Sequence, residues 1–357
     1  MEQLEAFYES TPKAVGFIER KIEIPSYTVN LFGPPKSGKT WLVLDYLSNI
    51  PKKRHIYIDL RDLRLDKSAL GVELEAFIRR HRIETAVLDH YDGSVPLPSC
   101  RQCIVVTEAP YGDNPFMPLL HCPTLDFEEF LAFERRPQDL EHSFSHYLRS
   151  GSLPAMSQRH DTLLTMGMHE TLRLIFPDAK ERDLFRTMAR FQGKPISAHQ
   201  LYTIVKKERR ISKDWLYKTL KLWEDRGIVS YLPKAERTRA AAKALFFDFA
   251  LPASLYFEKS LMGQLTVIAA RRLMERHPDL LYSDRIDFID PESRRAWLLS
   301  PFADARNGAR RVAAAAEEIE RYGIEAVTIL TVANTFSFTF KKRPVRGEPF
   351  FQWMLGD

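Results

Sequence analysis

The chain has 357 residues, of which 45% are hydrophobic and 28% are charged, with 15 Gly and 22 Pro. This composition excludes collagen-like, low-complexity and wholly disordered proteins, and the length predicts about two or three domains. The chain has no apolar run of about 18 residues and no basic N-terminus followed by an apolar stretch. We therefore expect neither a membrane span nor a secretion signal, and a cytoplasmic protein.

The first 125 residues alternate short apolar strands with amphipathic helices. We expect helices at 38–47 and 69–82, and strands at 27–32, 55–60, 85–88, 102–107 and 122–125. Strands that are separated by helices favour a parallel sheet with helices on both faces. An α/β fold is therefore expected for this part of the chain.

A glycine-rich loop connects the first expected strand to the first expected helix. It satisfies the pattern G-x-x-x-x-G-K-[ST] and consists of Gly33, Pro34, Pro35, Lys36, Ser37, Gly38, Lys39 and Thr40, followed by Trp41. In such a loop the backbone N–H groups face phosphates, and glycine lets the backbone approach them closely. We expect Lys39 to reach the β- and γ-phosphates and the Thr40 hydroxyl to ligate Mg²⁺. The loop therefore predicts a site for Mg·ATP, and we expect the loop residues and Trp41 to contact the nucleotide.

The same chemistry needs a carboxylate at the end of a later apolar strand to help hold the metal ion. Two residues fit this requirement, Asp59 and Asp89. Asp89 is followed by His90, whose imidazole can accept a proton near neutral pH, and Asp92 lies close by as a substitute. Slow or absent turnover of bound ATP remains the alternative to hydrolysis.

The three cysteines allow two interpretations. Cys100 and Cys103 form a C-x-x-C and Cys122 follows a histidine, which is compatible with zinc. However, Cys103 and Cys122 each lie at the start of an expected strand. Strand ends that flank a third strand lie roughly 10 Å apart, too far to share one metal ion. The strand interpretation is favoured.

The predicted secondary structure of the rest of the chain changes twice along the sequence. Residues 127–180 are expected to be helical, and three helices at 181–191, 198–208 and 213–226 then precede two strands at 228–232 and 244–249. Three helices followed by a two-stranded ribbon are the outline of a winged helix-turn-helix, with Ser197 and Ser212 as plausible N-caps. The last 100 residues mix helices at 261–276 and 309–322 with strands at 285–289, 296–299 and 326–332.

All of the excess positive charge of the chain lies in one segment. Residues 206–243 hold twelve Lys or Arg and five Asp or Glu, although the whole chain has a net charge of only +5. In a winged helix the third helix enters the major groove of DNA and the ribbon contacts the backbone. The expected DNA-binding residues are Lys206, Lys207, Arg209, Arg210, Lys213, Lys218, Arg237 and Arg239. No base-reading pattern is evident, so we expect weak sequence preference, with a protein-binding role as the alternative.

Several motifs in their order along the chain resemble the archaeal-type ATPases of the AAA superfamily, which combine a P-loop domain, a winged helix and a C-terminal nuclease-like domain. The matching segments are 17–20, the glycine-rich loop, 57–59, 105–107, 125–131, 146–154 and 243–248. The resemblance favours Asp89 as the metal carboxylate because in related ATPases it ends the third strand. It also implies that His90 replaces the usual glutamate and that Thr107 senses the γ-phosphate.

The departures from this family pattern are informative. Thr107 is followed by Glu108 rather than by small polar residues, and no arginine precedes the fifth strand. Arg135 and Arg136 are candidates for completing the site of a neighbouring subunit, or else they belong to a solvated helix face. In the C-terminal domain only Asp287 matches the nuclease carboxylates. One carboxylate cannot hold a catalytic metal ion, so an inactive restriction-endonuclease-like domain is expected.

These expectations combine into one architecture and two hypotheses for function. The domains are a P-loop ATPase core at 1–125, a helical lid at 126–180, a winged helix at 181–250 and a nuclease-like domain at 251–357. The first hypothesis is an ATPase whose nucleotide state controls DNA binding by the winged helix. The second is a nucleotide-gated scaffold that binds a protein partner through the winged helix or the C-terminal domain, and an oligomer is compatible with either.

Overall fold

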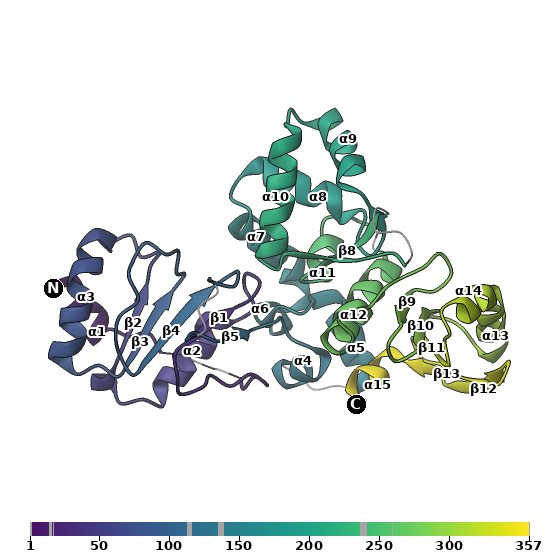
Figure 1. Ribbon diagram of the computed structural model, residues 1–357, viewed down its shortest axis with the longest axis horizontal. Coiled ribbons are helices and arrows are strands. Elements are labelled where there is room, and N and C mark those ends of the chain that lie inside the picture. The colour runs from purple at the N-terminus through teal and green to yellow at the C-terminus, as the bar shows by residue number, and fades with distance from the viewer. Residues whose placement is uncertain are drawn as a thin grey trace. The chain divides into compact units, whose positions relative to one another are not determined.

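The computed structural model describes residues 2–13, 16, 18–112, 116–134, 139–235, 241–258 and 260–356. They form two compact units (Figure 1). The first unit contains Met1–Thr124 and the short segment Asp225–Ile228, and the second contains Leu125–Glu224 and Val229–Asp357. Within the described residues, no helix has the length and apolar character needed to cross a membrane.

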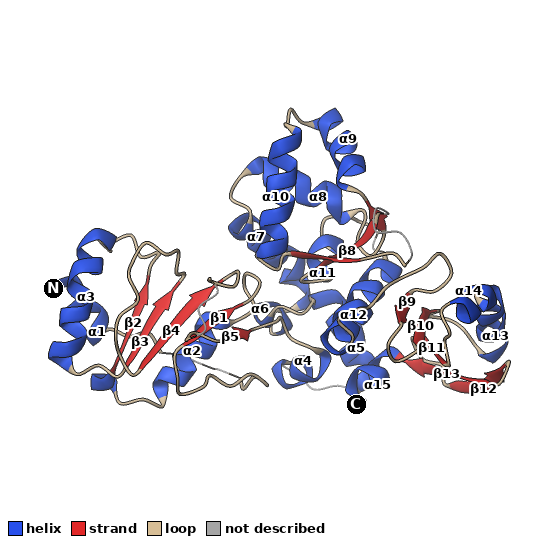
Figure 2. Cartoon of the chain, in the orientation of Figure 1, coloured by secondary structure: helices blue, strands red, loops and turns tan. Residues whose placement is uncertain are grey.

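The first unit is built on a five-stranded sheet whose neighbouring strands are all parallel (Figure 2). The strand order is β2-β3-β4-β1-β5, with β1 at Val29–Phe32, β2 at His55–Asp59, β3 at Thr85–Asp89, β4 at Gln102–Thr107 and β5 at Leu119–His121. The expected parallel α/β sheet is therefore present, and it is consistent with a P-loop nucleotide-binding core.

The fifth strand differs from the sequence-based expectation. It ends at His121 instead of beginning at Cys122. The Cys122 N–H still donates to the Phe32 carbonyl at 2.7 Å, but the next residue is Pro123, which has no N–H to extend the ladder. The apolar residues that follow are therefore outside the sheet.

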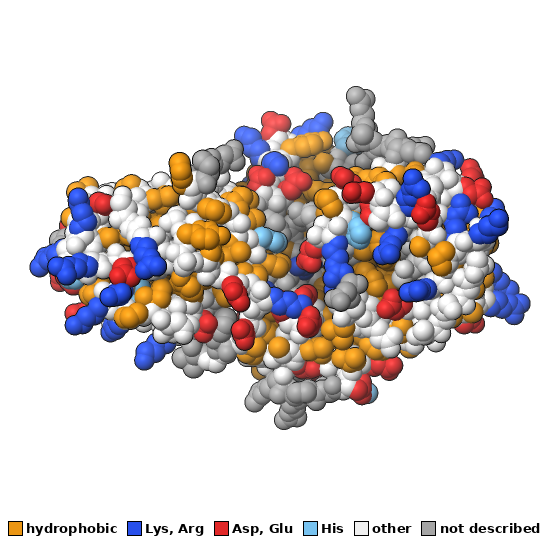
Figure 3. Space-filling model, turned by 60° about the horizontal axis from the view of Figure 1, so that its bottom comes forward, with side chains coloured by type: hydrophobic (Ala, Val, Ile, Leu, Met, Phe, Trp, Pro, Cys, Tyr) orange, Lys and Arg blue, Asp and Glu red, His pale blue; other side chains and the backbone are white. Residues whose placement is uncertain are grey.

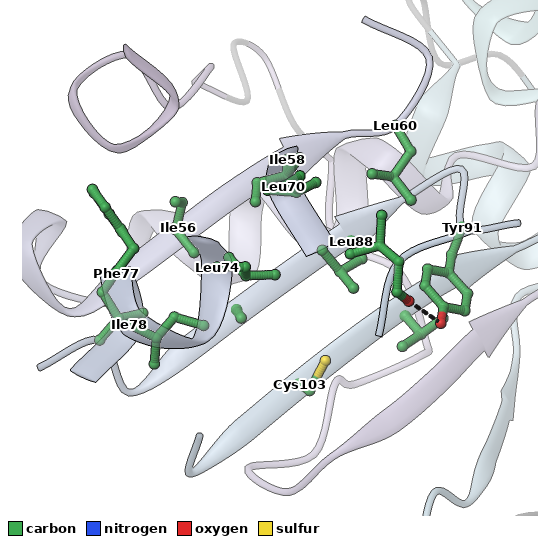
Figure 4. Close-up of a cluster of buried hydrophobic side chains, with 14 of the residues drawn as sticks. Ile56, Ile58, Leu60, Leu70, Leu74, Phe77, Ile78, Leu88, Tyr91 and Cys103 are labelled. Carbon is green, nitrogen blue, oxygen red and sulfur yellow. Dashed lines mark hydrogen bonds between the residues drawn. The ribbon is translucent and has the colours of Figure 1, made fainter. Parts of the chain in front are cut away.

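Helices cover both faces of this sheet. Strand residues alternate between the faces, so Ile56 and Ile58 pack with α3 (Lys67–His81) and with Leu4 of α1 (Glu2–Glu9), as Figure 4 shows for α3. Tyr57, between them, packs on the other face with α2 (Lys39–Ser48). The period of two that predicts a strand thus separates two hydrophobic cores. Helix α1 was not expected from the sequence.

The second unit begins with short helices in place of one continuous helical stretch. They are α4 (Phe127–Phe133), α5 (Leu140–Ser150), α6 (Pro154–Ser157) and α7 (Asp161–Ile175). Gly151 ends α5 with a positive φ of 79°, and Pro154 starts α6, a position where its missing N–H costs nothing. These residues account for the breaks that apolar periodicity alone does not show.

A module of three helices and a small antiparallel sheet follows. We call residues 179–246 the helix–sheet module; it contains α8 (Ala179–Ala189), α9 (Ala198–Glu208), α10 (Lys213–Asp225), β6 (Pro195–Ile196), β7 (Val229–Leu232) and β8 (Ala242–Phe246), with sheet order β6-β8-β7. The expected caps are confirmed, because Ser197 Oγ accepts from Gln200 N–H and Ser212 Oγ from Trp215 N–H. Trp223 is fully buried in the core of this module.

The C-terminal part of the second unit contains a mixed sheet of order β12-β13-β11-β10-β9. Its strands are β9 (Phe288–Asp290), β10 (Arg295–Leu299), β11 (Ala326–Thr331), β12 (Phe336–Phe340) and β13 (Arg343–Pro349). The accompanying helices are α11 (Ala250–Ala253), α12 (Leu261–Arg276), α13 (Ala305–Ala314), α14 (Ala316–Arg321) and α15 (Phe350–Leu355). The hairpin β12–β13 and α15 were not expected, and the single helix expected at 309–322 is two helices.

Candidate nucleotide-binding site

The carboxyl ends of the parallel strands bring the residues of the candidate site to one edge of the sheet. Asp59 of β2 pairs in register with Asp89 of β3, and Phe32 of β1 pairs with Thr107 of β4. The glycine-rich loop starts directly after Phe32 and His90 follows Asp89. Parallel pairing alone therefore gathers segments that lie far apart in the sequence, as ligand sites in open α/β sheets require.

The glycine-rich loop has two positions where only glycine fits. A Cβ on Gly33 would lie 2.2 Å from the carbonyl oxygen of Cys122, well inside van der Waals contact. Gly38 is the N-cap of α2 and has a φ of 97°, a left-handed conformation that L side chains rarely adopt. Glycine is thus required at position 33 because another backbone segment passes close by, and at position 38 because the backbone is left-handed there.

Lys39 is buried and its ammonium group lies inside the loop. Its Nζ donates to the carbonyl oxygens of Gly33 and Pro34, each at 2.8 Å. Burial lowers the pKa of Lys39, which the nearby Cys122, Glu108 and Asp89 partly oppose. A buried cation that donates to carbonyl oxygens can exchange these bonds for the oxygens of a phosphate, which are stronger acceptors.

Two further features support the loop. The guanidinium of Arg20 is buried and donates to the carbonyl oxygens of Ser37 and Pro123, both at 2.9 Å, so it ties the loop to the chain after β5. Ser37 Oγ is buried and has no hydrogen-bond partner among the described residues. A buried hydroxyl without a partner inside the loop matches a ligand rich in acceptor oxygens. Arg20 lies in a segment that the family resemblance includes.

Asp89 is 1% exposed and accepts hydrogen bonds on both oxygens. Thr40 Oγ1 and the Tyr57 hydroxyl each donate to Oδ2 at 2.7 Å, and the backbone N–H of His90 donates to Oδ1 at 2.8 Å. The two residues expected to ligate Mg²⁺ are therefore already in contact. Tyr57 was missed in the sequence as a site residue, although its position two residues before Asp59 on an apolar strand is visible there.

Asp59, the competing metal carboxylate, has a different partner. Its Oδ1 lies 2.8 Å from Nδ1 of His90 and accepts the N–H of Arg61 at 2.9 Å. Burial tends to raise the pKa of Asp59, but the hydrogen bonds from His90 and from the Arg61 backbone outweigh it and hold that pKa below its usual value. Asp92, the other candidate base, is held by Lys67 through an Oδ2–Nζ contact of 2.5 Å.

Thr107 lies at the end of β4 and is fixed from two sides. Its Oγ1 donates to the carbonyl oxygen of Ala109 at 2.6 Å and accepts from the Asn30 amide at 2.9 Å. Asn30 of β1 is fully buried, and its side-chain oxygen accepts the N–H of Tyr111 at 2.8 Å. The amide therefore positions the residues that follow β4. A buried asparagine within an apolar strand was a signal in the sequence that had no assigned role.

Glu108, the departure from the family pattern, is surrounded by cations within the first unit. Arg61 Nη2 lies 3.6 Å from its Oε1, and Arg226 of the Asp225–Ile228 segment donates through Nε to its Oε2 at 2.5 Å. Burial raises the pKa of Glu108, and Arg226, Lys39 and Arg61 together bring it below its usual value. Glu108 is therefore an anion held beside the glycine-rich loop.

These contacts fit Mg·ATP. The loop offers a buried ammonium, the N-terminus of α2 and a Ser37 hydroxyl that has no partner in the described part of the chain, all of which suit phosphates. Thr40 and Asp89 offer the oxygen ligands that Mg²⁺ accepts together with phosphates and water. Trp41, the last residue expected to contact the nucleotide, is 48% exposed at the start of α2.

The expected DNA-binding residues lie on the helix–sheet module. Lys206 and Lys207 end α9, Arg209 and Arg210 form the turn, and Lys213 and Lys218 lie on α10; all six are exposed. Arg209 forms an ion pair with Asp183 at 2.7 Å. Arg237 and Arg239, and likewise Arg135 and Arg136, lie outside the described residues.

Asp287 lies directly before β9 and has two cations beside it. Its Oδ2 accepts from Leu299 N–H at 2.9 Å and from Arg311 at 3.2 Å, and Lys243 Nζ lies 3.7 Å from Oδ1. Lys243 is buried, and its ammonium lies 4.7 Å from the centre of the Tyr282 ring. These contacts hold the Asp287 carboxylate in place.

The cysteines lie on the two faces of the first sheet. Cys103 packs in the core beneath α3, with Cys100 beside it, whereas Cys122 packs in the core beneath α2. Throughout the described part of the chain, no group of three or more His, Cys, Asp or Glu side chains is arranged to hold a metal ion.

No protein-family model matches the chain, and no curated protein sequence matches it. Among solved structures, it is similar to the Walker-type ATPase PABY2304 of Pyrococcus abyssi, with 14% identity and a TM-score of 0.40 over 64% of this chain and 91% of that chain. It is also similar to the Aeropyrum pernix ORC1 protein in complex with DNA, with 12% identity and a TM-score of 0.31 over 77% of this chain and 93% of that chain. Likeness at this level does not show a family.

Proposed function

We propose that this protein binds Mg·ATP at the loop from Gly33 to Thr40 and hydrolyses it. The observation that carries the proposal is the 2.7 Å hydrogen bond between Thr40 Oγ1 and Asp89 Oδ2, because it joins the two proposed magnesium ligands beside the buried Lys39. Phosphate transfer in such sites depends on positioning and on stabilising charge, both of which these side chains supply. Thr107, held by Asn30, is proposed to contact the γ-phosphate.

His90 is proposed as the group that accepts the proton of the attacking water. In the reaction the water oxygen bonds to the γ-phosphorus, and the bond from that phosphorus to the bridging oxygen breaks. Its electron pair stays on ADP, and the water proton moves to the imidazole. Asp92 is a weaker candidate for this role because Lys67 holds its carboxylate.

Nucleotide binding and steady-state ATP hydrolysis test the proposal. Lys39→Ala should abolish both, since the ammonium is lost from the loop, while Lys52→Ala, an exposed lysine of the same unit, should change neither. An unfolded Lys39→Ala protein would give the same loss, so circular dichroism of both variants is part of the experiment. Binding of ATP by well-folded Lys39→Ala with wild-type affinity would show that this loop is not the site.

We further propose that the helix–sheet module is a winged helix that binds duplex DNA. Five of its exposed cations form no ion pair with a carboxylate among the described residues: Lys206, Lys207, Arg210, Lys213 and Lys218. They are concentrated at the end of α9, in the turn and on α10. By contrast, basic and acidic side chains are interspersed over much of the face drawn in Figure 3. A local excess of unpaired cations is the usual electrostatic basis for phosphate contacts.

A salt-dependent DNA mobility shift tests this second proposal. The double variant Lys213→Glu/Lys218→Glu should weaken binding and reduce its salt dependence, because about two phosphate contacts are lost. The matched control is Arg306→Glu/Arg310→Glu on α13, which changes the net charge equally at two exposed positions. Absence of any shift at low salt would refute DNA binding and favour the protein-scaffold hypothesis.

A further inference from the structure

The strongest unassigned feature of the first unit is the contact between Asp59 and His90. Asp59 and Asp89 pair in register on β2 and β3. His90, the residue after Asp89, therefore lies next to the end of β2, where Asp59 is. His90 has a φ of 54°, a left-handed conformation that is uncommon for a residue other than glycine. Such a conformation persists only where its surroundings hold it, and it often marks a functional position.

The hydrogen bonds show which group donates and which accepts in the contact between Asp59 and His90. Asp59 Oδ1 accepts the Arg61 N–H, which fixes the carboxylate against its own turn, and the same oxygen lies 2.8 Å from His90 Nδ1. A carboxylate only accepts, so Nδ1 is the donor. Nε2 then carries the lone pair of the neutral ring, and it has no hydrogen-bond partner among the described residues. The imidazole side chain is 29% exposed, so water can reach it.

We propose that Asp59 is the positioning residue for His90: it holds the imidazole in the Nδ1–H tautomer and leaves Nε2 as the acceptor for the attacking water. This inference rests on the proposed ATPase function for its kinetic consequence, but the tautomer itself is a property of the nucleotide-free protein. Asp59 thereby takes a role different from that of Asp89, although the two residues end neighbouring strands with similar sequences.

The other charged groups near the His90 imidazole have other interaction partners. Asp89 Oδ1 lies 3.7 Å from His90 Nδ1 but receives the backbone N–H of His90, and its Oδ2 receives Thr40 and Tyr57. The side chain of Arg61 lies beside Glu108. Among the described residues, Asp59 is therefore the carboxylate with an oxygen at hydrogen-bond distance from Nδ1 of His90, and its removal frees the imidazole to rotate or to change tautomer.

The first measurement is the tautomer of His90. Long-range ¹H–¹⁵N spectra of protein labelled at histidine ring nitrogens distinguish Nδ1–H from Nε2–H, and the His90→Gln variant identifies the signal. We expect the Nδ1–H form in wild type and its loss in Asp59→Asn. The matched control is Asp139→Asn: Asp139 Oδ2 lies 2.7 Å from His142 Nδ1 in an exposed pair, and its removal should leave the His90 signal unchanged.

The second measurement is a kinetic cycle. Asp59→Asn should lower kcat by about 10²-fold, similar to His90→Ala, and should add little in the His90→Ala background, because both changes remove one function. The dissociation constant of a fluorescent ATP analogue should stay within about twofold of wild type in each variant. A structural role alone would instead alter nucleotide binding, or would lower kcat equally in both backgrounds.

The outcomes separate this inference from the proposed function. The Nε2–H tautomer in wild type, or independent kinetic effects of the two substitutions, would overturn the Asp59 proposal. If wild type shows the Nδ1–H tautomer and loses it in Asp59→Asn but does not hydrolyse ATP, the positioning contact stands and the proposed hydrolysis is wrong.

Discussion

The side-chain amide of Asn30 joins β1 to β4 through the Thr107 hydroxyl, at an Nδ2–Oγ1 distance of 2.9 Å. The same amide nitrogen donates to the carbonyl oxygen of Val105, and the side-chain oxygen accepts the N–H of Tyr111. One buried side chain therefore fixes the end of a strand and the start of the loop after it. This contact is specific to an amide, because it needs a donor and an acceptor together.

Replacing Asn30 by Asp should therefore destabilise the first unit although the shape is conserved. The carboxylate lacks the two donors that reach Val105 and Thr107, and a buried group left without its partners costs about 1–3 kcal/mol. Urea denaturation measures this loss in the free energy of unfolding. Asp45→Asn, on the surface of α2 (where Asp45 is part-exposed), should by comparison change stability little. Equal stability of wild type and Asn30→Asp would contradict the role given to the amide.

Gly33→Ala should abolish nucleotide binding. The new Cβ would clash with the Cys122 carbonyl at 2.2 Å, so either the loop or the chain after β5 has to move. Gly323→Ala is the control: its φ of 62° carries the strain of a left-handed residue, about 1 kcal/mol, but nothing lies within 4 Å of the added Cβ. Titration with a fluorescent ATP analogue distinguishes them, and full binding by Gly33→Ala would show that the loop tolerates a shift.

Tyr57→Phe should weaken magnesium-dependent nucleotide binding without emptying the site. The substitution removes the hydroxyl that donates to Asp89 Oδ2, while Thr40 and the His90 N–H still hold the carboxylate. Loss of a hydrogen bond to a charged group costs about 1.5–3 kcal/mol, and part of this loss is expected in the affinity for Mg·ATP. Calorimetric titration with and without Mg²⁺ measures it. An unchanged magnesium dependence would remove Tyr57 from the site.

Asp290 provides a pH test of stability in the C-terminal sheet. Burial raises its pKa, but the Ser293 hydroxyl, the imidazole of His277 at 2.6 Å and the backbone N–H groups of Glu292 and Ser293 hold that pKa below the usual value of 3.8. A lowered carboxyl pKa contributes stability that is fully present above the usual pKa and is lost as pH falls through the lowered value.

Asp290→Asn should accordingly destabilise the protein at pH 7 by about 1–3 kcal/mol, since the charge-assisted hydrogen bonds are lost. The difference from wild type should shrink as pH falls below 3.8, where the carboxyl of the unfolded chain takes up its proton, and should vanish below the lowered native pKa. Urea denaturation at the two pH values measures both effects. A difference that stays constant with pH would mean that the charge of Asp290 does not contribute.

The sequence was most informative where local pattern and chemistry coincide. The loop from Gly33 to Thr40 and the parallel sheet were predictable because the motif, the apolar strands and the intervening helices all favour one arrangement. The caps Ser197 and Ser212 were predictable for the same reason, since capping chemistry is local. In contrast, the early end of β5 depends on Pro123, which has no N–H to donate to the neighbouring strand. This effect is predictable only if the strand that pairs with β5 is known.

The contacts among the site residues were not predictable from local pattern. Asp59 and Asp89 both end apolar strands, and only the pairing of β2 with β3 shows that one contacts Thr40 while the other contacts His90. Tyr57 and Asn30 lie inside apolar strands, where a sequence indicates burial but not the partner of a buried polar group. The hairpin β12–β13 was missed because its turn holds two lysines with positive φ, Lys341 and Lys342, where glycine or asparagine is the usual signal.

The placement of the cysteines has a practical consequence. All three thiols lie between residues 100 and 122, in the first unit, and two of them are buried on opposite faces of its sheet. The second unit contains none. Modification of the two buried thiols, Cys103 and Cys122, by a thiol reagent thus reports selectively on opening of the first unit. Comparing the rate of this modification with the loss of fluorescence from Trp223, in a variant whose other four tryptophans are replaced by phenylalanine, would show whether the two units unfold together or one at a time.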